Sequence, residues 1–185
     1  MKKTLGPIYA DDATENVSLL LRLRLPWLIA GLLLGGITTL VVSRFETTLE
    51  ADVRLAFFIP IIVYMSGAVG AQTESIYVHN LNKHQATLRV YLIKELALGL
   101  MLGAIFGAIL ALFAFVVFGA QAVATTVGLA MFTGVATASI VGLIVPTILK
   151  REHQDPSVGA APVVTAIQDL ISLLIYFVIA STIIL

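Results

Sequence analysis

This 185-residue chain has no cysteine and little charge. Without cysteine it can form no disulfides, no thiolate metal site and no cysteine nucleophile. Only 12% of its residues are charged, whereas a soluble domain carries roughly a quarter. The formal net charge is zero, so no basic surface indicates a nucleic-acid partner. The composition therefore argues against disulfide-stapled scaffolds, thiol enzymes and nucleic-acid-binding proteins.

Apolar residues dominate instead. They make up 59% of the chain, and the mean hydropathy is +1.01. Such a chain cannot cover itself with polar side chains, so membrane lipid must be part of its solvent. A transmembrane helix needs about 20 mainly apolar residues. We therefore predict an all-α integral membrane protein, with a cytoplasmic segment over 1–24 and one five-helix transmembrane domain over 25–185. The five predicted spans are 25–43, 55–72, 96–118, 122–148 and 161–185.

Lysine and arginine are distributed unevenly between the two sides of the membrane. With five spans the termini lie on opposite sides, so the N-terminal segment shares a face with the connections over 73–95 and 149–160. Nine of the eleven basic residues fall on that face, and Arg44 and Arg54 fall on the other. Because positive charge is retained in the cytoplasm, we expect a multi-pass cell-membrane protein with its N-terminus inside and Leu185 outside.

Small residues recur at every fourth position on two of the predicted helices. Such faces let helices approach closely and gain van der Waals contact. We favour this packing interpretation, and a pore wall is the alternative. Pro146, near the end of the fourth span, indicates a kink or the end of that helix. The two rows are Gly99, Gly103 and Gly107 on the third span and Gly134, Ala138 and Gly142 on the fourth.

Asp169 is an acid inside an apolar span. It lies eight residues into the segment 161–185, and no lysine or arginine falls within any of the five spans. A charged side chain at the bilayer centre costs about 2.5–3.5 kcal/mol on insertion scales, so it normally faces a cavity or a partner. A cation or a proton from solution is then the natural counter-charge. A protonated aspartate bonded to a neighbouring helix is the structural alternative.

Helical spacing groups other polar residues with Asp169. Thr165, Asp169, Ser172 and Tyr176 are separated by four, three and four residues, which predicts one polar stripe. Hydroxyl, carboxylate and backbone oxygens are hard ligands that suit Mg²⁺, with Mn²⁺ and Ca²⁺ as alternatives. All three histidines fall outside the spans, which argues against a zinc site. No catalytic triad at membrane depth, phosphate-binding glycine loop or HExxH motif is present, so we expect no enzyme.

A run of small residues marks the second span. Glycine weakens a helix and exposes carbonyl groups, as in the broken helices around transported ions. Contact with another helix is an equal alternative. We predict that residues of this run and the polar residues after it line an ion path: Ser66, Gly67, Ala68, Gly70, Gln72 and Thr73.

A single carboxylate provides too little charge for a divalent ion in a low-dielectric site. A twofold homodimer would bring two copies of Asp169 to one axis. Without a cation between them the two carboxylates would repel each other. We therefore infer a homodimer in membrane lipid, with a cation pore on its axis.

Two segments of the sequence resemble the MgtE-type magnesium channel and transporter family. Phe57-Phe-Ile-Pro60, followed by Ser66-Gly-Ala-Val-Gly-Ala-Gln72, is similar to that family's FFxP and GGNxGxQ signature. Asp155-Pro-Ser-Val-Gly-Ala-Ala-Pro162, with Thr165, Asp169 and Leu174-Ile-Tyr-Phe177, is similar to its DPAxxSGPxxTTxxD…LIYF stretch. Arg24-Leu-Pro-Trp27 matches the entry to the family's first helix.

The resemblance implies a homodimer of five-helix subunits whose second and fifth helices line a cation pore. On the fifth helix, Ser172 and Tyr176 are then expected to line the pore. It places the principal pore aspartate at Asp169, the backbone of Thr165 at the same ion site, and Asp155 near the cytoplasmic mouth. Family members often carry magnesium-sensing cytoplasmic domains, for which this chain has no room. Residues 9–23 then correspond to a remnant of the connecting plug helix, with three acids as ion contacts: Asp11, Asp12 and Glu15.

The sequence also departs from the family pattern. Ser66 replaces the first signature glycine, and Ala68 replaces the asparagine that helps line the family's pore. These changes leave the ion selectivity open. We predict a passive or weakly coupled divalent cation transporter, magnesium first. The alternatives are an antiporter that exports magnesium in exchange for sodium or protons, and a non-transporting membrane partner of another subunit.

Overall fold

A computed structural model describes residues 15–80, 88–151 and 156–185, and these residues are almost entirely helical. Five helices in the described ranges are long and apolar enough to cross a membrane, so the all-α prediction of five spans is confirmed. A short 3-10 turn, η1, and the short helix α2 join the first two spans. The elements are α1 (Val17–Val42), η1 (Ser43–Phe45), α2 (Glu46–Ala51), α3 (Arg54–Asn80), α4 (Leu88–Phe118), α5 (Gln121–Arg151) and α6 (Pro156–Ile184).

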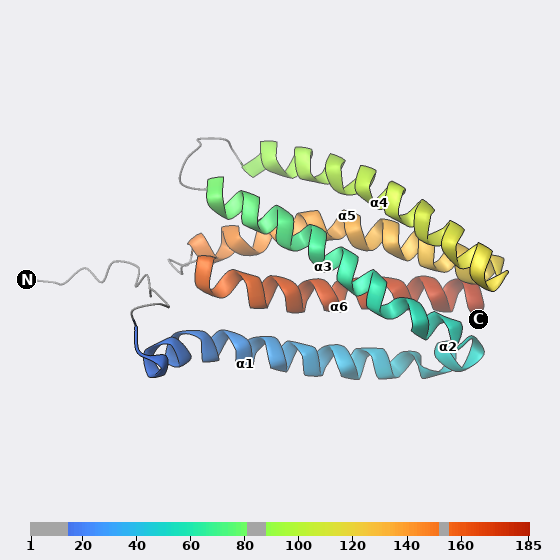
Figure 1. The fold of residues 1–185 in the computed structure, drawn as a ribbon, viewed down its shortest axis with the longest axis horizontal. Helices are drawn as coiled ribbons and strands as arrows, with labels where there is room; N and C mark the ends of the chain where they lie inside the picture. Colours follow the sequence, from blue (N-terminus) through green and yellow to red (C-terminus); the bar gives the residue numbers. More distant parts are fainter. Residues whose placement is uncertain (1–14, 81–87, 152–155) are drawn as a thin grey trace, which may run out of the picture.

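The helices form a bundle with α5 at its centre. Helix α5 packs against α3, α4 and α6, while α1 packs chiefly along α6. In Figure 1, α1 and α4 run along opposite edges, with α3, α5 and α6 between them. Within the most apolar 18-residue window of each helix, 67% of α5 is buried but only 6% of α1. Helix α5 is therefore the scaffold of the bundle, and α1 is its least supported member.

Several helices are longer than the apolar segments that predict them. Helix α1 begins at Val17, eight residues before the expected span, so residue 25, where the predicted domain begins, lies inside it. Helix α3 continues to Asn80, although the expected span ends at residue 72. The reason is physical, because an apolar run marks only the hydrocarbon depth while the helix continues into the polar layer. A tight turn precedes α5, and Gly119 takes a positive φ of 63° there.

Two expected interruptions of helices are absent from the described chain. The small-residue run in the middle of α3 causes no break, since the helix is continuous from Arg54 to Asn80. A neighbouring helix supports this run, because a Cβ on Gly70 would lie 3.5 Å from the Ala138 carbonyl oxygen of α5. Tertiary packing there outweighs the low helix propensity of glycine. Pro146 does not end α5 either, because that helix runs on to Arg151; a kink at this residue stays a prediction.

The two rows of small residues are packing faces, as we favoured. A Cβ on Gly103 would lie 2.5 Å from the carbonyl oxygen of Phe132, and one on Gly107 would lie 2.6 Å from that of Gly128. The row on α4 therefore lies directly on the backbone of α5. The row on α5 turns toward α3, since a Cβ on Gly142 would lie 2.6 Å from the Gly70 carbonyl oxygen. Such close approach is possible only without side chains.

Hydrogen bonds tie the bundle together at the end that holds α2 and the C-terminus. Thr48 Oγ1 and Ser181 Oγ lie 2.7 Å apart, which joins α2 to α6. Asp52 binds Arg54, with 2.6 Å between Asp52 Oδ2 and Arg54 Nη2, and it also accepts the Arg54 backbone N–H at 3.0 Å. The side-chain bond from Arg54 lowers the pKa of Asp52 below its usual value. The Asp52 carboxylate therefore fixes the start of α3.

Candidate functional site: a cavity around Asp169

Asp169 lies at the middle of a long helix. Helix α6 has 29 residues, Pro156–Ile184, and its middle residue is Leu170. Because the segment is apolar on both sides of Asp169 and has no break, we expect this carboxylate to lie far from both membrane surfaces. Asp169 thus lies near the middle of α6, and its depth in the membrane stays a prediction.

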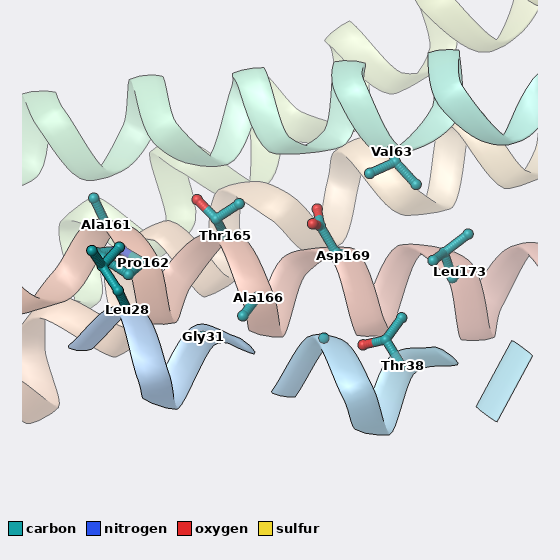
Figure 2. Close-up of a pocket in the computed structure, with 11 residues that line it drawn as sticks. Leu28, Gly31, Thr38, Val63, Ala161, Pro162, Thr165, Ala166, Asp169 and Leu173 are labelled. Atoms are coloured by element: carbon teal, nitrogen blue, oxygen red, sulfur yellow. The ribbon is translucent and has the colours of Figure 1, made fainter. Parts of the chain in front are cut away.

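A cavity of about 520 Å³ opens beside Asp169. Its walls come from α1, α3 and α6. Figure 2 shows Thr165 and Asp169 projecting from the same side of α6, with Val63 pointing toward them from α3. The lining residues are Leu28, Gly31, Gly35, Thr38, Val63, Ala161, Pro162, Thr165, Ala166, Asp169 and Leu173. The predicted pair of Thr165 and Asp169 thus lines one cavity.

The Asp169 carboxylate has no protein counter-charge in the described ranges. Its side chain is half-buried, and no hydrogen bond or ion pair joins it to another described residue. No group of three or more His, Asp or Glu side chains that could hold a metal gathers anywhere in those ranges. The alternative of an aspartate bonded to a neighbouring helix therefore finds no support among the described residues. A water-filled or ion-filled cavity remains the natural partner of this acid.

The predicted stripe on α6 divides in two. Ser172 and Tyr176 are fully buried and do not line the cavity. Ser172 Oγ donates to the Gln168 backbone oxygen at 2.7 Å, and Tyr176 Oη donates to the Leu55 backbone oxygen at 2.7 Å. Both side chains face the interior of the subunit, whereas Thr165 and Asp169 face the cavity. Pore lining by Ser172 and Tyr176 stays a prediction.

The predicted pore residues on α3 also take different directions. Ser66, Gly70 and Thr73 are buried within the bundle, and Thr73 Oγ1 donates to Glu95 Oε2 of α4 at 2.9 Å. Gly67 is half-buried, and Ala68 and Gln72 are exposed on the surface of the single subunit. Their role in a pore remains a prediction.

Helix α1 contributes residues that the sequence prediction left out. Gly31, Gly35 and Thr38 line the cavity opposite Asp169. A Cβ on Gly31 would lie 3.7 Å from the Pro162 backbone oxygen, so glycine lets α1 lie close to α6. The sequence feature that could have indicated this close contact is the four-residue spacing of Gly31 and Gly35, which is the same as the glycine spacing in the packing row on α4.

Some predicted residues lie outside the described ranges. Asp155 is one of them, as are Asp11 and Asp12 of the proposed plug-helix remnant. Glu15 is described and is exposed just before α1. Of the metal ligands that the sequence predicts, Thr165 and Asp169 are the two that the described ranges place at the cavity.

Comparison with known sequences identifies the family. A sequence model of the MgtE family, described as a divalent cation transporter, matches residues 59–179. That match covers about two thirds of the chain, from α3 to α6. The chain belongs to the MgtE family. The family resemblance read from the sequence is thereby confirmed, and with the five apolar helices it makes the chain a multi-pass membrane protein.

Three family members show how far the similarity extends. The chain is 32% identical to the magnesium transporter MgtE of Bacillus subtilis over 85% of its own length. It is 29% identical to that of Enterococcus faecalis over 96% of its length and 30% identical to that of Thermus thermophilus over 85%. The matches cover only 36%, 40% and 35% of these relatives. The chain thus spans well under half the length of the curated relatives it matches.

Proposed function

We propose that the chain transports a divalent cation, magnesium first, across the cell membrane through a path that passes Asp169. The observation that carries this proposal is a half-buried carboxylate in the middle of α6, beside a cavity of about 520 Å³. No hydrogen bond or ion pair joins this carboxylate to the rest of the described chain. Relatives named magnesium transporters support the choice of ion.

The cavity suits a hydrated divalent cation in size and chemistry. Mg²⁺ keeps several waters in octahedral geometry and binds few protein carboxylates directly. Six waters at about 30 Å³ each occupy roughly 180 Å³, well within the cavity. The polar side chains that line it, Thr38, Thr165 and Asp169, offer only oxygen. Manganese and calcium use the same ligand type, so they are the further candidate ions.

Two subunits are needed to balance the charge of such an ion. One subunit supplies one carboxylate to the cavity, and the described chain offers no cluster of three acids or histidines. A second copy across a twofold axis would supply the partner's Asp169 and a total charge of −2. Helix α1 and the Ala68 face of α3 leave a large apolar surface uncovered, which a second copy could cover. We therefore propose a homodimer with the ion path on its axis.

The orientation follows from the distribution of basic residues. With the N-terminus in the cytoplasm, Asp169 lies between a cytoplasmic mouth near the start of α6 and an outer mouth near α2. The described part of the outer end carries Glu46, Glu50 and the Asp52–Arg54 pair. Cysteine insertion at each end, followed by labelling with a membrane-impermeant thiol reagent, tests this arrangement.

Flux through the purified protein tests the transport proposal. The full chain is placed in liposomes that contain a magnesium-sensitive dye, and Mg²⁺ is added outside. We expect dye signal from the unmodified protein and at least a tenfold slower signal from Asp169→Asn. Lys94→Gln is the control, because it removes an exposed charge on α4, a helix that contributes no residue to the cavity. If the unmodified protein gives no divalent flux and Asp169→Asn behaves identically, the chain is instead a non-transporting partner of another subunit.

The same vesicles separate a channel from an antiporter. A channel carries Mg²⁺ down its own gradient with no sodium or proton gradient present. Flux that appears only when a sodium or proton gradient is imposed would replace the channel by coupled exchange. A crystal soaked in Mn²⁺ would add a direct test of the site, since anomalous density is expected between two copies of Asp169.

A further inference from the structure

Three polar side chains meet inside the subunit, on the side of α6 that faces α3 and α5. Ser66, Gln168 and Ser172 are each at most 1% exposed. A Cβ on Gly134 of α5 would lie 2.7 Å from Ser66 Oγ and 4.0 Å from Ser172 Oγ. Both hydroxyl groups therefore approach the same point on α5. We refer to Ser66, Gly134, Gln168 and Ser172 as the buried oxygen cluster.

Hydrogen bonds within the buried oxygen cluster leave two oxygens without partners. Gln168 Nε2 donates to Ser172 Oγ at 2.9 Å and to the Gly134 backbone oxygen at 3.4 Å. Ser172 Oγ in turn donates to the Gln168 backbone oxygen at 2.7 Å. In the described part of the chain, Gln168 Oε1 and Ser66 Oγ have no hydrogen-bond partner. Buried polar atoms in native proteins are nearly always satisfied. Ser139 Oγ and Thr126 Oγ1 also have no partner in the described ranges, but only the buried oxygen cluster holds two such oxygens, and this indicates a guest.

The chemistry of the cluster restricts what the guest can be. The Gln168 amide already uses its nitrogen as a donor, so the oxygen that remains can only accept. A guest must therefore present positive charge or a donor hydrogen to these oxygens. All the groups of the cluster are neutral, so they cannot balance a divalent ion in a low-dielectric interior. Neutral hydroxyl, amide and carbonyl oxygens are suitable ligands for a monovalent cation, as the sodium sites of secondary transporters formed by backbone carbonyls illustrate.

The buried oxygen cluster is separate from the cavity around Asp169. Gln168 and Asp169 are consecutive on α6, but successive helical side chains point about 100° apart. Gln168 is buried against α5 through its bond to Gly134, whereas Asp169 lines the cavity toward α1. None of the four residues of the cluster lines that cavity. One helix thus carries two polar sites on different sides.

We propose that the buried oxygen cluster binds a single Na⁺ ion within each subunit. Its ligands are Ser66 Oγ and Gln168 Oε1, supported by Ser172 Oγ. The three side chains are each at most 1% exposed, and such a closely packed site favours Na⁺ over the larger K⁺. Binding itself does not depend on the transport proposal. The effect of Na⁺ on transport does rest on the transport proposal. Because Gln168 and Asp169 are neighbours on α6, Na⁺ in the buried oxygen cluster would alter the position of the Asp169 carboxylate that meets the divalent ion.

Thermal unfolding of the purified full chain tests Na⁺ binding. The protein is kept in detergent without divalent ions, and NaCl replaces choline chloride at constant total salt. A ligand that binds only the folded state raises the unfolding midpoint with its concentration. We expect a saturable rise with Na⁺, a smaller one with K⁺, and no rise for Ser66→Ala or Gln168→Leu. A midpoint that responds equally to Na⁺ and choline would show that water alone occupies the cluster.

Two control variants keep the result specific. Ser139→Ala removes another buried hydroxyl without a partner in the described chain, in the contact between α4 and α5, and should keep the Na⁺ response. Asp169→Asn should also keep it, which separates this proposal from transport. If Ser66→Ala does not fold, binding of ²²Na⁺ to the unmodified protein is measured instead. Bound ²²Na⁺ that unlabelled Na⁺ displaces and choline does not would support the site. If the protein retains no ²²Na⁺, the proposal is wrong.

Discussion

Replacing Gly103 by alanine should open the contact between α4 and α5 and destabilise the bundle. A Cβ at this position would lie 2.5 Å from the Phe132 carbonyl oxygen, where ordinary contact begins at 3.4 Å. That oxygen belongs to the backbone of the central helix, so no side-chain rotation can relieve the clash. The two helices must separate by about 1 Å, in an interior packed as densely as a crystal.

The size of the effect can be judged against a second glycine. Overpacking costs about 1–3 kcal/mol, and contact with rigid backbone favours the upper half of that range. Alanine also gains about 1 kcal/mol of helix propensity over glycine. Gly36 on α1 offers the same gain without the clash, because a Cβ there meets nothing within 4 Å. The propensity term cancels between the two variants, which leaves a difference of about 2 kcal/mol.

Thermal unfolding of the two variants in the same detergent measures this difference. For a chain of this length, 1 kcal/mol corresponds to about 2–4 °C in the midpoint. We expect Gly103→Ala to unfold about 4–8 °C below Gly36→Ala. If Gly103→Ala unfolds at the same temperature as Gly36→Ala or above it, α4 does not rest on the backbone of α5 as described, and the packing interpretation of the glycine row fails.

Three further outcomes are expected. Tyr176→Phe removes a buried hydrogen bond to a backbone carbonyl of α3, so it should lower stability by about 1 kcal/mol in denaturant unfolding while leaving ion selectivity unchanged. Because the chain has no cysteine, Ala68→Cys on the exposed face of α3 should form an oxidant-induced disulfide between two copies in liposomes. Val116→Cys on α4 should form none. Equal cross-linking of the two variants, or no cross-linking of Ala68→Cys, would contradict the proposed dimer. Asp52→Asn should modestly lower the unfolding midpoint at pH 7, because it removes the ion pair with Arg54 while the amide oxygen can still accept the Arg54 backbone N–H. The bond to Arg54 lowers the pKa of Asp52. The stability difference between the unmodified protein and Asp52→Asn should therefore be fully present above about pH 4 and should disappear as the pH falls further. If the difference persists at low pH, this ion pair is not its source.

Composition predicted the architecture because lipid selects for long apolar runs. Five such runs became five helices, and the absence of any basic residue from them singled out Asp169. The small-residue rows also indicated which helices approach closely, and the structure has Gly103 on the backbone of α5. Each of these features depends on residue type and spacing alone, so a sequence contains the necessary information.

The direction of individual side chains could not be predicted in the same way. Thr165, Asp169, Ser172 and Tyr176 fall within one broad face by spacing, yet three helices meet along that face. Ser172 and Tyr176 find partners inside the bundle, while Asp169 faces the cavity. Which neighbour covers which part of a helical face depends on tertiary packing.

The contribution of α1 to the cavity was hidden for a related reason. Glycine offers no side chain that suggests a role, and a threonine in an apolar span can bond to its own helix, as Thr38 Oγ1 does to the Leu34 backbone oxygen at 3.0 Å. Such residues define the shape of a cavity only by where their helix lies. Sequence spacing cannot supply that position.

The sparse support of α1 gives the surrounding lipid a direct influence on the cavity. This helix forms one wall beside Asp169, yet only 6% of its most apolar window is buried within the subunit. Whatever presses on its outer surface, acyl chains or a second subunit, therefore sets how far that wall stands from α6. A change in bilayer thickness acts on the tilt of a weakly held helix. The width of the cavity beside Asp169 is thus determined jointly by the polypeptide and by the bilayer in which it sits.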